Sequence, residues 1–225
     1  WVLSNHDIPR HVSRYGRPAK DRERFGPTKY DFEGLDLDLG RRRARAAALL
    51  SLGLPGSVYL YQGEELGLEE VTAIPDSLRD DPVFFRSEHG EVGRDGCRVP
   101  LPWEPTGDSL GFGDNGAWLP QPPEWSERAA SVQRDEPDSM LSLYRTALAA
   151  RRREPALTAP GFAWVDGPSD VLRFRRSDPA GASVEVVVNQ SATPVSLPPG
   201  EVLVASEPVE GSMLGSDAAA WVRLS

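Results

Sequence analysis

Two short apolar segments and one amphipathic segment organise the first sixty residues. Residues 1–4 (WVLS) and 58–61 (VYLY) are apolar runs that predict two buried strands. Between them, residues 38–53 repeat leucine and alanine at helical spacing, which predicts a helix that ends at Gly53 and Pro55. Two strands joined by a helix form a βαβ unit, in which polar residues just after the strands commonly line a ligand site.

Two loops connect the predicted elements. The polar residues 6–36 are interrupted by glycine and proline and predict the first loop. Residues 69–137 are rich in proline, glycine, aspartate and tryptophan, and a loop of that length in a compact domain commonly serves a function. We expect at least two of its tryptophans, Trp103, Trp118 and Trp125, to pack within the loop rather than to bind a ligand.

The last third of the chain changes from a helical to a β pattern. A stripe of leucine and alanine predicts a helix that Asp138 or Ser139 caps and Pro155 ends. From residue 157 onward, short β-branched or alternating runs are separated by turn sequences, which predicts an antiparallel β-domain. These runs cover residues 162–165, 171–176, 183–190, 193–197, 201–206 and 221–225.

Composition narrows the class of protein. The 225 residues are 39% hydrophobic and 26% charged, as is typical of a globular protein. The net charge of −9 argues against a nucleic-acid or anionic-membrane partner, and no apolar run approaches the roughly 18 residues of a membrane span. The single cysteine, Cys97, excludes an intrachain disulfide. No signal peptide is visible, but a chain without its true start would not show one. We expect a cytoplasmic location.

The polar groups that could carry chemistry follow the two predicted strands. Asn5, His6 and Asp7 come directly after the first strand, and in isolation such a triplet is typical of a turn. An arginine-rich segment (GRDGCRVPLPW, residues 93–103) lies in the second loop. Carboxylates and guanidinium groups bind hydroxyls and indole rings stack on sugars, so this combination favours a polyhydroxylated ligand.

Four ordered motifs carry a specific resemblance. The segment VLSNHD resembles the fourth conserved motif of the α-amylase superfamily, glycoside hydrolase family 13, and YLYQGEELGL resembles the eighth strand and its loop. The pair PDSLRDDPVFFRS and GRDGCRVPLPW is similar to the long loop that follows in the α-glucosidase and oligo-1,6-glucosidase branch. The terminal β-runs resemble domain C of that family. Val99 and Leu101 depart from the usual threonine and methionine.

The resemblance implies an α/β plus all-β architecture. Residues 1–156 would form the last two β/α units of a (β/α)8 TIM barrel with the long loop after strand eight, and residues 157–225 a β-sandwich domain C. A barrel needs about 250 residues, so we expect the chain to be the C-terminal portion of a longer enzyme. The family's nucleophile and acid/base would then lie outside it. We expect the chain alone to be inactive, and to self-associate or to pair with the missing N-terminal part.

The resemblance also implies roles for individual residues. Asp7 would be the third catalytic carboxylate, which accepts hydrogen bonds from sugar hydroxyls at the scissile residue. His6 would bind another hydroxyl, and Arg94 would pair with Asp7 or with the sugar. Asp95 and Arg98 would orient the loop through ion pairs. The implied ligand is an α-linked gluco-oligosaccharide, and we expect no metal or cofactor.

Three functions are compatible with this sequence. The first is part of a retaining α-glucosidase that hydrolyses terminal α-glucosidic bonds of maltose-like oligosaccharides. The second is a glucosyl-transferring or isomerising relative, either trehalose-forming or sucrose-isomerising, and the third is a noncatalytic carbohydrate-binding fragment. Among the remaining polar residues, we expect Glu64 and Glu65 to be structural, His11 and His89 to face solvent, and Cys97 to be an inert, packed thiol.

Overall fold

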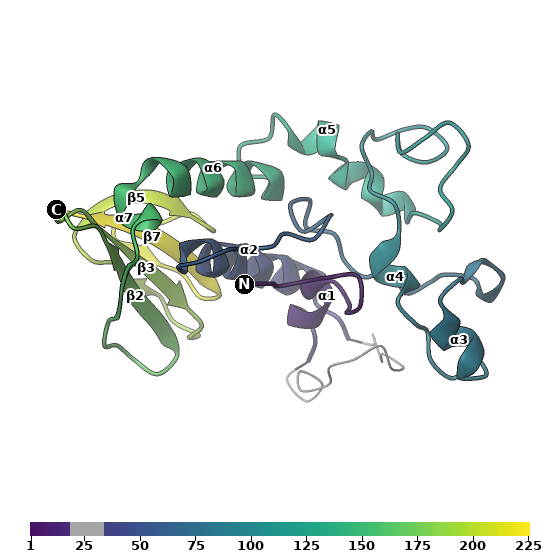
Figure 1. Ribbon diagram of the computed structural model, residues 1–225, viewed down its shortest axis with the longest axis horizontal. Helices are drawn as coiled ribbons and strands as arrows, with labels where there is room; N and C mark the ends of the chain where they lie inside the picture. The colour runs from purple at the N-terminus through teal and green to yellow at the C-terminus, as the bar shows by residue number, and fades with distance from the viewer. Residues whose placement is uncertain (19–33) are drawn as a thin grey trace. The chain divides into compact units, whose positions relative to one another are not determined.

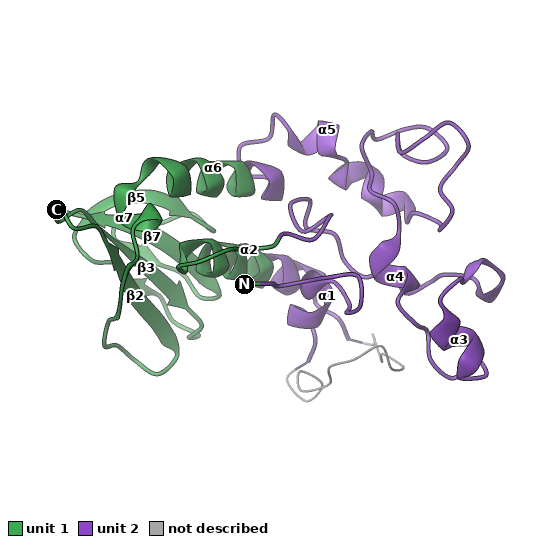
Figure 2. Ribbon diagram, in the orientation of Figure 1, with its two compact units in different colours: residues 1, 42–59, 143–225 green, residues 2–41, 60–142 purple. Residues whose placement is uncertain are grey.

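The computed structural model describes residues 1–18 and 34–225, which form the helices and strands labelled in Figure 1. The chain divides into two compact units (Figure 2). Unit 1 contains residues 1, 42–59 and 143–225, and unit 2 contains residues 2–41 and 60–142. These ranges do not coincide with the predicted domains 1–156 and 157–225. The predicted domains are those of a complete enzyme with a full barrel, and they stay a prediction.

The two long helices are confirmed. Helix α2 (Leu37–Gly53) begins where Leu39 N–H donates to the Asp36 carboxylate over 2.8 Å. Helix α6 (Met140–Arg153) is capped by Ser139, whose hydroxyl accepts from Ser142 N–H over 3.0 Å. Pro155 ends α6 as predicted, because it occupies the first turn of a separate short helix, α7 (Pro155–Thr158).

The predicted antiparallel β-domain is present in unit 1. Its main sheet has five strands in the order β1-β2-β3-β7-β5, and a second sheet pairs β4 with β6. Each of the adjacent pairs is antiparallel. The strands are β1 (Gly161–Trp164), β2 (Val171–Ser177), β3 (Ser183–Asn189), β4 (Val195–Ser196), β5 (Gly200–Ala205), β6 (Met213–Leu214) and β7 (Ala218–Leu224).

The five-stranded sheet is buried on both faces at its centre. On one face, Val187, Ala220 and Val222 share an apolar core with Leu197 and Leu214, which flank or belong to the small sheet. On the other face lies α2: Trp221 donates from its indole N–H to Leu49 O over 3.0 Å, and a Cβ on Gly53 would lie 2.8 Å from Val186 Cγ2. Burial on both faces explains why β3 reads as an almost continuous apolar run.

The two strands predicted in the barrel part are not formed in the structure. Neither residues 1–4 nor residues 58–61 form a strand; a backbone hydrogen bond joins Tyr59 N–H to Trp1 O over 2.9 Å. Both side chains are exposed, with Trp1 at 53% and Tyr59 at 68%. A parallel strand is held by neighbours along its length, and a single bonded position does not make a ladder. The β/α units of a barrel therefore remain a proposal.

The two predicted loops contain short helices that periodicity does not reveal. Helix α1 (His11–Tyr15) interrupts the loop over residues 6–36, whose middle, residues 19–33, lies outside the described part of the chain. The second loop is organised by η2 (Asp76–Leu78), α3 (Pro82–Arg86), α4 (Asp95–Arg98), η3 (Pro123–Arg128) and α5 (Ala130–Gln133).

The second loop has an apolar core of its own in unit 2. Leu101, Leu119 and Trp125 are among its buried residues. Of the three loop tryptophans, only Trp125 is buried; Trp103 and Trp118 are exposed by 48% and 53%. The expectation that at least two of them pack within the loop is therefore wrong, because only Trp125 belongs to the buried core.

Candidate functional site

The Asn5–Asp7 segment forms a tight, exposed turn in unit 2. Asp7 N–H donates to the Asn5 side-chain oxygen over 2.8 Å, a local contact typical of aspartate and asparagine in turns. The side chains of His6 and Asp7 are 68% and 50% exposed. The turn therefore presents an imidazole and a carboxylate to solvent.

A buried arginine anchors this turn to the rest of unit 2. Arg10 is 2% exposed and its guanidinium donates to Gln62 O over 2.6 Å and to Cys97 O over 2.9 Å. Its backbone N–H donates to the Glu70 carboxylate over 2.9 Å. The residues that follow Asp7 are thereby fixed to the segment after Tyr61 and to α4.

His11 is buried, which contradicts the expectation that it faces solvent. It is 1% exposed, and its Nδ1 lies 2.8 Å from the Ser4 hydroxyl. Burial, with smaller contributions from the positive charges of Arg14 and Arg10, lowers the pKa of His11 to about 3. The ring is therefore neutral at pH 7. The Glu64 carboxylate approaches the same Nδ1 at 4.0 Å, so serine, histidine and acid are not arranged as a catalytic relay.

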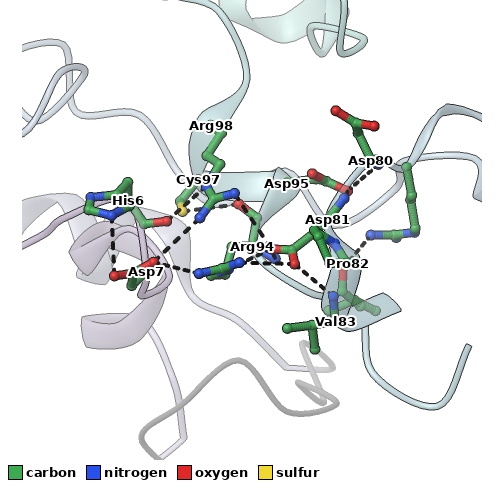
Figure 3. Close-up of polar contacts among 12 residues, drawn as sticks. His6, Asp7, Asp80, Asp81, Pro82, Val83, Arg94, Asp95, Cys97 and Arg98 are labelled. Atoms are coloured by element: carbon green, nitrogen blue, oxygen red, sulfur yellow. Dashed lines mark hydrogen bonds and ion pairs between the residues drawn. The ribbon is translucent and has the colours of Figure 1, made fainter. Parts of the chain in front are cut away.

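The structure brings Asp7, His6 and Arg94 together (Figure 3). Arg94 Nη1 lies 2.8 Å from Asp7 Oδ1, and His6 Nε2 lies 3.3 Å from Asp7 Oδ2. Arg98 joins them, with Nη2 3.4 Å from Asp7 Oδ1 and Nε donating to His6 O over 2.9 Å. Arg98 was expected to orient the second loop through ion pairs; its ion pair with Asp7 joins that loop to the turn.

A fifth residue, Asp81, completes the cluster and was not singled out from the sequence. Its side chain is 0% exposed and accepts from Arg94 Nε over 2.6 Å and from Arg94 Nη2 over 3.2 Å. Burial opposes its ionisation, but hydrogen bonds from Arg94 and from the backbone of Val83 outweigh it and lower the pKa of Asp81 to about 2. Asp81 is thus a buried carboxylate.

Local sequence explains how Asp81 reaches this position. Asp81 precedes Pro82 and caps α3, accepting from Val83 N–H over 2.9 Å, so the Asp-Pro pair was a signal for this residue. Asp95 supports it from α4, because its carboxylate accepts from the backbone N–H groups of Asp80 and Asp81 over 2.9 and 3.2 Å. The expectation that Asp95 orients the loop through an ion pair is therefore wrong: among the described residues its carboxylate binds backbone, and the ion pairs are made by Arg94 and Arg98.

The other polar predictions near the cluster have mixed outcomes. Cys97 is 1% exposed, its thiol lies 3.1 Å from Arg94 O, and burial raises the pKa of Cys97 to about 12, which confirms an inert thiol. His89 is exposed, as predicted, and stacks on Phe84 with ring centroids 4.4 Å apart. Across residues 1–18 and 34–225, no three or more histidine, cysteine, aspartate or glutamate side chains gather as metal ligands.

This arrangement can bind a ligand rich in hydroxyl groups. The half-exposed Asp7 carboxylate accepts hydrogen bonds, and the adjacent guanidinium and imidazole groups donate them.

Within the residues that the structure describes, none of the helices has the length and apolar character that a membrane crossing demands.

Comparison with known proteins supplies the family. A model described as "Alpha amylase, catalytic domain" matches residues 1–160. A probable alpha-glucosidase of Rhizobium meliloti (strain 1021) is 37% identical over 177 residues, which cover 79% of this chain and 28% of the relative.

Two solved structures have a similar fold. The alpha-glucosyl transfer enzyme XgtA is 34% identical with a TM-score of 0.71, and the match covers 99% of this chain and 40% of XgtA. The trehalulose synthase MutB from Pseudomonas mesoacidophila MX-45 is 26% identical with a TM-score of 0.72, over 99% of this chain and 42% of MutB. The chain therefore spans less than half the length of these relatives. Its match to the catalytic-domain model over more than half of its own length shows that it belongs to the alpha-amylase family, glycoside hydrolase family 13.

Proposed function

We propose that this chain forms part of a retaining α-glucosidase that hydrolyses terminal α-glucosidic bonds of maltose-like oligosaccharides. The observation that carries the proposal is the contact of Arg94 with a half-exposed Asp7, at 2.8 Å, in the segment that resembles the family's fourth motif. The proposal includes the last two β/α units of a barrel and a cytoplasmic location. The remaining barrel units would belong to a longer protein, the complete enzyme.

Asp7 has a defined role in this proposal. A retaining glycosidase attacks the anomeric carbon with one carboxylate and protonates the leaving oxygen with a second, through a transition state with positive charge on the sugar. Asp7 is neither group. Its carboxylate accepts hydrogen bonds from hydroxyls of the scissile sugar, and these bonds strengthen as positive charge develops. His6 binds a further hydroxyl, and Arg94 holds Asp7 in place.

Glucosyl transfer is the second candidate. It keeps the same carboxylates but passes the glucosyl group to a second sugar instead of water. The names of XgtA and of the trehalulose synthase MutB support this alternative, since both share the fold of the chain. The outcome depends on which acceptor reaches the intermediate, and Asp7, His6 and Arg94 are compatible with either one.

Incubation of the complete enzyme with maltose distinguishes the two reactions. Hydrolysis gives glucose alone, whereas transfer gives longer or rearranged oligosaccharides, and chromatography of the products with time separates them. Sucrose as substrate tests the isomerising form of transfer. If the complete enzyme converts neither sugar nor a nitrophenyl α-glucoside, both candidates fail and a noncatalytic carbohydrate-binding role takes their place.

A further inference from the structure

We infer that Asp81 is a positioning residue for the proposed sugar site: it aligns Arg94 and Arg98 so that one nitrogen of each reaches Asp7. The inference rests on the proposed function for the role of Asp7. It deepens that proposal by assigning the residue that sets the geometry of the two arginines, although this residue cannot touch a sugar because its side chain is 0% exposed.

The contacts of Arg94 define its orientation. A guanidinium group is planar and carries five N–H donors in a rigid fork, so two bonds to one carboxylate fix its plane. Arg94 gives its Nε and Nη2 donors to the two oxygens of Asp81, over 2.6 and 3.2 Å. Only Nη1 is directed to Asp7, over 2.8 Å. The exposed contact therefore depends on the buried one.

Arg98 repeats the pattern more loosely. Its Nη1 lies 3.6 Å from Asp81 Oδ2, and its Nη2 lies 3.4 Å from Asp7 Oδ1. Two guanidinium groups are thus shared between two carboxylates, one buried and one half-exposed. Without the negative charge of Asp81, both positive charges would face Asp7 alone and would compete with sugar hydroxyls for its oxygens.

Asp81 is itself held from several directions. Arg94 N–H donates to Asp81 Oδ2 over 2.9 Å, in addition to the side-chain bonds. Gly93 lies against it at a φ of +67°, and a Cβ on Gly93 would come within 2.8 Å of the Asp81 Cβ. A side chain at position 93 would therefore push Asp81 away from the arginines. The backbone of residues 93 and 94 thus fixes the position of the Asp81 carboxylate.

A measurement on the chain itself tests the geometry without any activity. Nitrogen-15 NMR resolves arginine Nε–H groups, and an Arg94→Lys variant identifies the Arg94 signal. In the wild-type chain and in Asp7→Asn, we expect slow hydrogen exchange at Arg94 Nε–H, because Asp81 accepts that bond. In Asp81→Asn, which retains the size of the side chain and its capping ability, we expect exchange to be about 10-fold faster. Exchange that accelerates in Asp7→Asn but not in Asp81→Asn overturns the inference.

Kinetics of the complete enzyme test whether Asp81 acts through Arg94. We expect Asp81→Asn to lower kcat/KM for maltose by about 10-fold, the size of an ordinary coupling between charged neighbours. In an Arg94→Ala background the same substitution should cost only about 2-fold, because the main group that it positions is absent. If Asp81 merely caps α3, the loss is equal in both backgrounds, and that result overturns the inference.

The kinetic experiment needs a matched control, and it must distinguish failure of this inference from failure of the proposed function. Asp76→Asn removes an exposed carboxylate of the same loop that lies 3.7 Å from Arg79, and it should leave kcat/KM unchanged in both backgrounds. A wild-type complete enzyme without activity on α-glucosides contradicts the proposed function. The exchange rates at Arg94 Nε–H then decide the positioning role of Asp81 on their own.

Discussion

At the scale of single residues, burial separates the acidic side chains that can meet a ligand from those that cannot. Asp7 and Asp81 contact the same arginine, yet one side chain is 50% exposed and the other 0%. Sequence reasoning singled out Asp7, His6 and Arg94, which the structure brings together, but the motif offers no measure of burial. Asp81 lies in the segment PDSLRDDPVFFRS. Only its place before Pro82 indicated that its position is fixed.

Burial was also not foreseen for His11, and it leads to a testable prediction. It was expected to face solvent, whereas its burial lowers its pKa from 6.5 to about 3. Between those two values the unfolded chain binds a proton that the folded chain does not. The free energy of unfolding should therefore fall as the pH decreases below about 6.5, by up to about 1.4 kcal/mol per pH unit.

Urea unfolding at pH 6.5 and pH 5 measures this effect against a His11→Asn variant, whose amide can still bond Ser4. Relative to the variant, the wild-type chain should lose about 2 kcal/mol over this interval. The comparison is necessary because burial raises the pKa of Glu70 to about 7, which adds stability as the pH falls and is common to both proteins. His89→Asn, at an exposed site, is the control. Equal pH dependence in wild type and His11→Asn would show that His11 does not titrate as described.

At the scale of elements, regular patterns predicted structure well where an element buries one face along its whole length. Helices α2 and α6 and strands β2, β3 and β7 have a buried face over most of their length, and each overlaps a predicted element. Strand β6, with only two residues, was not predicted. The short helices α1, α3 and α4 do not, because four or five residues are too few to show a period. The apolar residues 1–4 and 58–61 have the composition of strands but not the paired neighbours that strands require.

Close packing of two helices in unit 2 provides a prediction at this scale. Alanine normally stabilises a helix interior relative to glycine, by about 1 kcal/mol. At Gly40 in α2, however, a Cβ would lie 2.3 Å from Val12 O and 3.1 Å from Gly16 N. Gly40→Ala should therefore lower the free energy of unfolding by about 1–3 kcal/mol through overpacking, measured by urea denaturation. Gly113→Ala, where no atom lies within 4 Å, should have little effect. A stabilised Gly40→Ala chain would refute this packing.

At the scale of the whole molecule, exposed apolar side chains predict association. Trp1 and Tyr59 of unit 1 are 53% and 68% exposed, and Val2 and Leu60 of unit 2 are 54% and 40% exposed. Exposed apolar groups favour contact with other chains. We therefore expect the 24.6 kDa chain to sediment as a larger species at micromolar concentration.

Substitution identifies the residues responsible for this association. Tyr59→Ser combined with Leu60→Ser should shift the sedimentation toward the monomer. Phe85→Ser, which removes one exposed apolar side chain at a separate site, should have a smaller effect. A wild-type chain that stays monomeric across the concentration range would contradict the prediction.

The central claim, that Asp7 is the sugar-binding carboxylate of an α-glucosidase, is tested most directly by kcat of the complete enzyme with a nitrophenyl α-glucoside. Asp7→Asn preserves the shape of the side chain but removes its charge, so kcat should fall about 100-fold or more with the fold intact by circular dichroism. Arg94→Ala should have a smaller effect, because in the proposed mechanism Arg94 holds Asp7 in place and Asp7 contacts the sugar. An Asp7→Asn enzyme that keeps near wild-type kcat would remove this residue from the mechanism.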